Sequence, residues 1–190
     1  MQTTDPMTLK LLLSLALSAL FALMAHRMFL TFGAQVPADY AGTAPPFDAR
    51  RHLSGDLLSE GVIFGPSGRV TSRFTARMTG VWGNSGGVLT EDFVFASGET
   101  LQREWTITPT GSDRFTATAP DIEGQAIDEI SGATLRMKYR LRLGEGAGGH
   151  VVNVTDWIYL TQDGVMINRS EMRKFGVKVA ELVATIRPAR

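Results

Sequence analysis

The sequence predicts an all-β protein: an antiparallel, up-and-down barrel of about eight to ten strands, preceded by one N-terminal hydrophobic helix. Three observations support this fold class. From about residue 53 onward, short segments alternate polar and apolar side chains. This two-residue period is typical of a strand with one solvent-exposed and one buried face. Turn sequences rich in Gly, Asn, Asp and Ser separate these segments. No segment of this region shows the apolar stripe of an amphipathic helix.

The alternation is clearest between residues 69 and 79. Arg or Thr occupies every odd position from Arg69 to Thr79, and apolar residues occupy the even positions from Val70 to Met78, except Ser72. This segment should therefore bury one face. Comparable segments lie at roughly 57–64, 87–96, 100–109, 113–119, 121–130, 133–143, 150–161, 164–173 and 177–187.

Consecutive strands joined by short turns form a meander, and the edges of such a sheet must be protected from pairing with other chains. Closure into a barrel removes the edges, and a barrel of about eight strands either fills with side chains or encloses one small ligand. A sandwich of two sheets is the alternative architecture.

Composition excludes several functions. The chain has 190 residues, with 19 Lys and Arg against 19 Asp and Glu, so it lacks the positive field that non-specific nucleic-acid binding requires. It has no cysteine, which excludes disulfides, thiolate metal sites and a lipid-modified cysteine. The glycines at 144, 146 and 149 match a dinucleotide-binding pattern, but a strand follows them where a helix is required. With its three histidines far apart, the sequence predicts no cofactor and no metal.

The first 30 residues read as a signal peptide or a membrane anchor. The run from Leu11 to Ala25 contains only Leu, Ala, Phe, Met and Ser, and its length of about 22 Å suits a signal peptide, whereas extension through Met28 to Phe32 would suit an anchor. Either interpretation places the following domain outside the cytoplasm. Residues 31–50 read as a linker or surface strap, and residues 51–190 as the barrel domain.

One charged pair falls among apolar residues that should face inward. Glu91 shares its parity with Leu89, Phe93 and Phe95, and Arg103 shares its parity with Leu101, Trp105 and Ile107. A three-residue loop at positions 97–99 would set Phe93 opposite Arg103 and leave Glu91 diagonal to it; a two-residue turn would set Asp92 opposite it. The pair is either a structural ion pair or a site where Arg103 anchors a ligand carboxylate or phosphate.

A second polar cluster comes later in the chain. Asp156, Asn168 and Arg169 interrupt otherwise apolar strands, beside Trp157 and Tyr159. They either pair on the outer face or form a network that orients a ligand head group, with the two aromatic residues as its walls.

The chain resembles a family of bacterial envelope proteins known as domain of unknown function 3833. The resemblance runs from about residue 47 to 186, and its most specific stretch is Asp156-Trp157-x-Tyr159-Leu160 followed by Ile167-Asn168-Arg169-Ser170-x-Met172-x-Lys174-Phe175-Gly176. It implies an exported, lipoprotein-type protein with a calycin- or lipocalin-like barrel, and no established activity. This chain lacks the family's usual lipid-bearing cysteine and has Gly132-Ala133-Thr134 where Gly-Asn-Ala is common.

These observations predict a periplasm-facing protein of the bacterial cell envelope whose barrel binds a fatty acid or other lipid. The alternatives are a structural or partner-binding protein with a filled barrel and an enzyme acting on modified lipids, with Glu91 or Asp156 as general base and Arg103 or Arg169 stabilising charge. The predicted partners are an apolar small molecule and, through the N-terminal segment, a membrane. The predicted ligand-binding residues are Glu91, Phe93, Arg103, Trp105, Tyr139, Asp156, Trp157, Tyr159, Asn168 and Arg169.

Overall fold

A computed structural model of the protein describes residues 5–144, 146 and 148–189. The chain divides into two compact units, Met1–Val36 and Pro37–Arg190. The first contains the helix α1 (Pro6–Phe29) and the short 3-10 helix η1 (Phe32–Ala34). The second contains all the strands of the described residues.

Helix α1 forms because its Leu, Ala and Met residues are strong helix formers. Pro6 occupies its first turn, and the Asp5 carboxylate accepts a hydrogen bond from the backbone N–H of Met7 at 3.4 Å. The helix has 24 residues, none of them buried, so it is about 36 Å long and exceeds the roughly 30 Å hydrocarbon core of a bilayer. In the described part of the chain it is the one helix long and apolar enough to cross a membrane, and it is compatible with either a signal peptide or an anchor.

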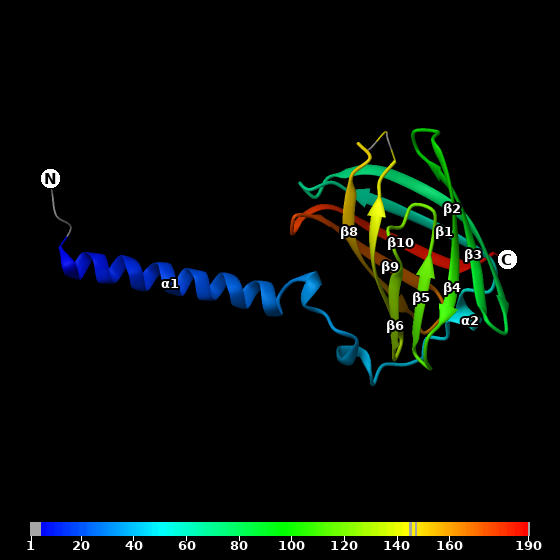
Figure 1. Ribbon diagram of the computed structural model, residues 1–190, viewed down its shortest axis with the longest axis horizontal. Coiled ribbons are helices and arrows are strands. Elements are labelled where there is room, and N and C mark those ends of the chain that lie inside the picture. The colour runs from blue at the N-terminus through cyan, green and yellow to red at the C-terminus, as the bar shows by residue number, and fades with distance from the viewer. Residues whose placement is uncertain (1–4, 145, 147, 190) are drawn as a thin grey trace. The chain divides into compact units, whose positions relative to one another are not determined.

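The second unit is a closed antiparallel barrel, in which every strand pairs with its neighbours in sequence and β1 pairs with β10 (Figure 1). Its ten strands are β1 Gly55–Phe64, β2 Val70–Gly83, β3 Gly86–Phe95, β4 Thr100–Pro109, β5 Arg114–Thr118, β6 Ala126–Ser131, β7 Thr134–Arg142, β8 Val151–Leu160, β9 Met166–Lys174 and β10 Val177–Pro188. The predicted up-and-down barrel with an N-terminal hydrophobic helix is confirmed, and the sandwich is excluded. Pairing of β1 with β10 from Leu57↔Pro188 to Phe64↔Glu181 leaves no open edge.

The alternation of β2 separates inside from outside as predicted. Phe74, Ala76 and Met78 are buried in the barrel core, whereas the intervening Arg and Thr residues are exposed. Val70 is the exception, with 52% of its surface exposed, because it lies at the first position of the strand, where the barrel opens to solvent.

The segment expected to form a strand at 121–130 is shorter than predicted. Strand β6 begins only at Ala126, and Ile122 makes an isolated bridge to Leu141. Gly124 adopts a left-handed conformation with φ of 78°, which bends the chain out of strand geometry. The resulting connection carries Asp121, whose side chain enters the site described below.

A short helix, α2 (Ala49–His52), lies at one end of the barrel (Figure 1). Phe47, Ala49 and Leu53 are buried in the barrel core at this end. The indole N–H of Trp82 donates to the Leu53 carbonyl at 3.0 Å, which ties α2 to the end of β2. The segment read as a linker thus contributes its last residues to the barrel core.

Contact between α2 and the sheet requires a glycine at position 80. A Cβ added to Gly80 would lie 1.7 Å from the Leu53 carbonyl oxygen, whereas at Gly83 the nearest atom would be 4.0 Å away. We expect Gly80→Ala to lower the free energy of unfolding by about 2 kcal/mol or more, because α2 must move out of position. Gly83→Ala, in the same strand, should change it by less than about 1 kcal/mol. Urea denaturation of both variants checks this, and equal effects would contradict it.

Candidate functional site: a barrel cavity with a buried acidic cluster

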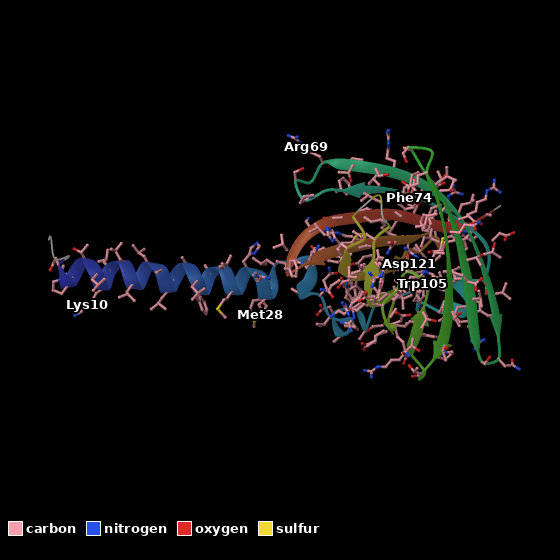
Figure 2. All side chains as sticks on the ribbon, turned by 45° about the horizontal axis from the view of Figure 1, so that its top comes forward. Lys10, Met28, Arg69, Phe74, Trp105 and Asp121 are labelled. Atoms are coloured by element: carbon pink, nitrogen blue, oxygen red, sulfur yellow. The ribbon has the colours of Figure 1, made fainter. Side chains whose placement is uncertain are left out.

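The barrel encloses a cavity of about 730 Å³. Most of its wall is apolar and comes from the inward-facing positions of the strands. Figure 2 labels three of the lining residues, Phe74, Trp105 and Asp121. Lining residues near α2 are buried, whereas those at the opposite end are partly exposed, so the cavity opens away from α2. The apolar lining includes Ile63, Phe74, Met78, Leu89, Phe93, Phe95, Leu101, Ile107, Phe115, Leu135, Met172 and Leu182.

Polar side chains interrupt this lining near the middle of several strands. Four of them are carboxylic acids, which we call the acidic cluster: Glu91, Asp121, Asp128 and Asp156. Arg103 is the only buried cation among the described residues that line the cavity. The other polar lining residues at this level are Ser59, Tyr139, Asn168 and Ser170.

Glu91 and Arg103 lie directly opposite each other on β3 and β4. Both registers considered from the sequence are wrong. The loop between β3 and β4 has three residues, but these are residues 96–98 and not the predicted 97–99. The Phe95 N–H donates to the Glu99 carbonyl at 2.9 Å and so sets this loop. Relative to the register predicted with a three-residue loop, the observed pairing is shifted by an even number of residues. The same side chains therefore face inward as predicted, and Arg103 has a carboxylate neighbour on the inner face.

The Arg103 guanidinium is held from several sides. Its Nε and terminal nitrogens donate to the Asp121 carboxylate at 3.0 and 2.6 Å, and another terminal nitrogen lies 3.7 Å from Oε2 of Glu91. The rings of Phe93 and Trp105 lie 5.9 and 5.6 Å from its central carbon. This cation is therefore already engaged by two carboxylates and two aromatic faces.

Burial raises the pKa of Glu91 to about 7, although Arg103 and the indole of Trp105 favour the ionised form. The Trp105 indole N–H donates to Oε2 of Glu91 at 3.2 Å. Asp156 and Asp121 raise the pKa further by repulsion. Near neutral pH this carboxyl group is therefore poised between its two protonation states.

On the neighbouring wall, Tyr139 donates its hydroxyl hydrogen to Oδ2 of Asp156 at 2.7 Å. Burial raises the pKa of Asp156, while the hydroxyls of Ser170 and Tyr139 and the charge of Arg103 oppose that shift. The Ser170 hydroxyl, on the residue paired with Asp156 across β8 and β9, favours the ionised carboxylate, and it also lies 3.4 Å from Oδ1 of Asn168. Oδ1 of Asp156 is left without a hydrogen-bond partner in the described part of the chain.

Asp128 lies on β6, two strands away from Asp156, with Met137 of β7 paired to both. Its side chain is buried, and only 3% of the residue's surface is exposed. Oδ1 of Asp128 has no hydrogen-bond partner among the described residues. Burial, followed by repulsion from Asp156, raises its pKa to about 7.

Seven of the ten residues predicted from the sequence line the cavity: Glu91, Phe93, Arg103, Trp105, Tyr139, Asp156 and Asn168. They come from β3, β4, β7, β8 and β9 and meet because each occupies an inward position. Trp105 packs edge-on against Tyr139, with ring centroids 5.5 Å apart, which joins the two walls.

Trp157, Tyr159 and Arg169 do not line the cavity, so the expectation that they surround a head group is corrected. Successive residues of a strand point to opposite faces, and each of the three has the opposite parity to Asp156 or Asn168 on its strand. Trp157 is fully buried beneath Tyr40, at 5.1 Å between ring centroids, and stacks on Tyr159. Arg169 pairs with Glu181 at 2.7 Å, with 45% of its side chain exposed. It cannot stabilise charge inside the barrel.

Sequence reasoning missed Asp121 and Asp128. The sequence predicts a continuous strand over residues 121–130, whereas Asp121 lies in the connection before β6, where alternation does not indicate the direction of a side chain. Asp128 shares its parity with the buried Ala126, which was the available signal. No group of three or more His, Asp or Glu residues suited to a metal ion occurs in the described part of the chain.

These features define a class of protein: a closed antiparallel β-barrel with an internal, mainly apolar cavity. Within that class, the chain belongs to the family described as "Protein of unknown function (DUF3833)", which matches residues 27–188. No curated protein matches it.

Among solved structures, the chain is similar to Rv2717c from M. tuberculosis, with a TM-score of 0.50 and 16% sequence identity over 78% of this chain and 99% of that one. It is also similar to mFAP1, a redesigned β-barrel bound to DFHBI, with a TM-score of 0.39 and 10% identity over 73% of this chain and 97% of that one. At these identities the likeness to Rv2717c concerns the fold alone.

Proposed function

We propose that this barrel binds a lipid-like small molecule, such as a fatty-acyl compound, with its alkyl chain among the aromatic and aliphatic side chains of the cavity. The cavity itself carries the proposal, because its volume of about 730 Å³ falls within the roughly 300–1,000 Å³ typical of ligand pockets. A protein with a purely structural role and a filled barrel would not need this space. The apolar wall would provide affinity and the polar residues orientation.

Native mass spectrometry of the protein purified from its own organism tests the proposal. We expect a bound species that organic solvent extracts, and affinity for alkyl compounds that rises about fourfold per added methylene, since each buried CH₂ contributes about 0.8 kcal/mol. Recovery of empty protein that also fails to bind a panel of alkyl compounds would contradict it.

A pair of variants distinguishes binding in the cavity from binding to the surface. Ser72 lies on the inner face of β2 and lines the cavity, whereas Thr75 of the same strand faces outward and is exposed. We expect Ser72→Trp to weaken binding of a fluorescent alkyl probe by about tenfold or more, because the indole occupies the cavity. Thr75→Trp should leave it unchanged. Equal losses in folded variants would place the probe elsewhere.

We further propose that α1 directs the domain to the bacterial envelope, as a signal peptide or an anchor facing the periplasm. Its length and apolar composition support this. Cell fractionation with protease protection tests the location, and N-terminal sequencing of the isolated protein tests cleavage. Recovery of the full chain in the cytosol would contradict the proposal.

A second candidate, an enzyme acting on a modified lipid, is favoured by one observation. The pKa of Glu91, raised to about 7, suits a general base, and Arg103 lies 3.7 Å away to stabilise developing negative charge. Incubation of lipid extracts with the protein and with Glu91→Gln, followed by mass analysis, tests this candidate. Identical product profiles would exclude Glu91 as a catalytic base.

A further inference from the structure

The charge balance of the cavity bears on the head group of its ligand. Five carboxyl groups line it, the four of the acidic cluster and the exposed Glu99 at the open end, whereas Arg103 is the single buried cation in the described lining. That cation donates to the Asp121 carboxylate through two separate nitrogens and lies near Glu91. A ligand carboxylate or phosphate would therefore be a third anion at one guanidinium, with Asp156 and Asp128 nearby.

Two carboxylate oxygens of the cavity lack hydrogen-bond donors in the described part of the chain: Oδ1 of Asp128 and Oδ1 of Asp156. Only 3% of the surface of Asp128 and 9% of that of Asp156 is exposed, and both side chains line the cavity. A buried acceptor without a donor costs free energy comparable to a lost hydrogen bond. These oxygens therefore mark the place where a bound molecule would supply N–H groups.

The donors near Asp156 are neutral hydroxyl groups. Tyr139 donates to Oδ2 of Asp156, and Ser170, which lies opposite Asp156 on β9, favours its ionised form. Above pH 7, where Glu91 and Asp128 are mostly ionised, the cavity thus combines an excess of acceptors with an excess of negative charge. Both imbalances are corrected by the same chemistry, a positively charged group that carries several hydrogen-bond donors.

We propose that the ligand of this cavity is a cationic amphiphile, an alkyl compound whose ammonium or related N–H head group binds Asp128 within the acidic cluster, on the same wall as Asp156. This inference rests on the proposed function, because it requires that the cavity hold an apolar chain. The chain lies along the apolar wall, and the head group reaches the acidic cluster at the middle of the barrel. Arg103 orders Asp121 and Glu91, and the carboxylates of the acidic cluster repel an anionic head group at that level.

Calorimetric titration with three compounds of equal chain length tests the head group. We expect dodecylamine to bind the full-length protein about tenfold or more tightly than dodecanol at pH 7.5, since hydrogen bonds to charged groups contribute about 1.5–3 kcal/mol. Dodecanoate should bind more weakly than dodecanol. Equal affinities for the amine and the alcohol, or tighter binding of dodecanoate, would overturn the cationic head group while leaving the apolar site intact.

Failure of all three compounds to bind the folded protein would overturn the proposed function together with this inference.

A matched pair of variants locates the head group. Asp128→Asn keeps the shape of the side chain but removes its charge, and it should weaken dodecylamine about tenfold while changing dodecanol less than about threefold. Glu129→Gln, the adjacent residue, does not line the cavity and pairs with Arg136 at 3.0 Å, so it should leave both affinities unchanged. Equal loss of amine and alcohol in Asp128→Asn would overturn the placement.

Discussion

Replacement of Arg103 by methionine should lower the free energy of unfolding by about 3–5 kcal/mol at pH 8, the cost typical of removing one member of a buried charge pair. The Arg103 side chain is 13% exposed, and its loss leaves Asp121 and the 11% exposed Glu91 without their cation. Methionine preserves much of the contact with the rings of Phe93 and Trp105. The effect therefore reports mainly the charge, and urea denaturation measures it.

The cost of Arg103→Met should decrease at pH 5, because Glu91 can then become neutral by binding a proton. Arg187→Met is the matched control. Arg187 also pairs with one glutamate, Glu60, at 2.6 Å, but 42% and 44% of the two side chains are exposed. Its loss should cost about 1 kcal/mol or less. Similar losses of free energy of unfolding for the two variants at pH 8 would show that the buried pair of Arg103 and Glu91 stabilises the fold no more than an exposed pair.

The barrel could be predicted because its evidence is local. Alternation in β2 and the turn sequences between strands appear in consecutive residues, and an even register shift at β3–β4 keeps the same side chains inside. For that reason Glu91 and Arg103 were placed together although their register was wrong.

The site was less predictable because it depends on strand parity and on residues distant in sequence. Trp157 and Asp156 are adjacent in the chain but lie on opposite faces, and a motif containing both does not show which one points inward. The partner of Arg103, Asp121, is 18 residues away in an irregular segment that the alternation pattern extends through. No periodic signal marks such a contact.

Stability should decrease as pH rises from about 5 to 8, and Asp128 should account for a large part of the change. Its pKa is about 7 in the folded protein and near 3.8 in the unfolded chain, and that of Glu91 is about 7 against 4.5. Between these values the folded state holds protons that the unfolded state has released, so the free energy of unfolding falls with increasing pH and levels off above about pH 7. The stabilisation is fully present only below the unfolded values.

Asp128→Asn cannot ionise, and it should therefore be more stable than the wild-type protein at pH 8, by on the order of 2–4 kcal/mol, with a smaller advantage at pH 5. Urea titrations at several pH values between 5 and 8 measure how steeply the free energy of unfolding changes with pH in the wild type and in Asp128→Asn. Glu129→Gln is the control, because it removes a carboxylate that pairs with Arg136 and Arg114 on the other face of β6. It should lower stability slightly and leave the slope unchanged. If the slope of Asp128→Asn equals that of the wild type, then Asp128 does not exchange its proton in this range, and the acidic cluster depends on Glu91 and Asp156 alone.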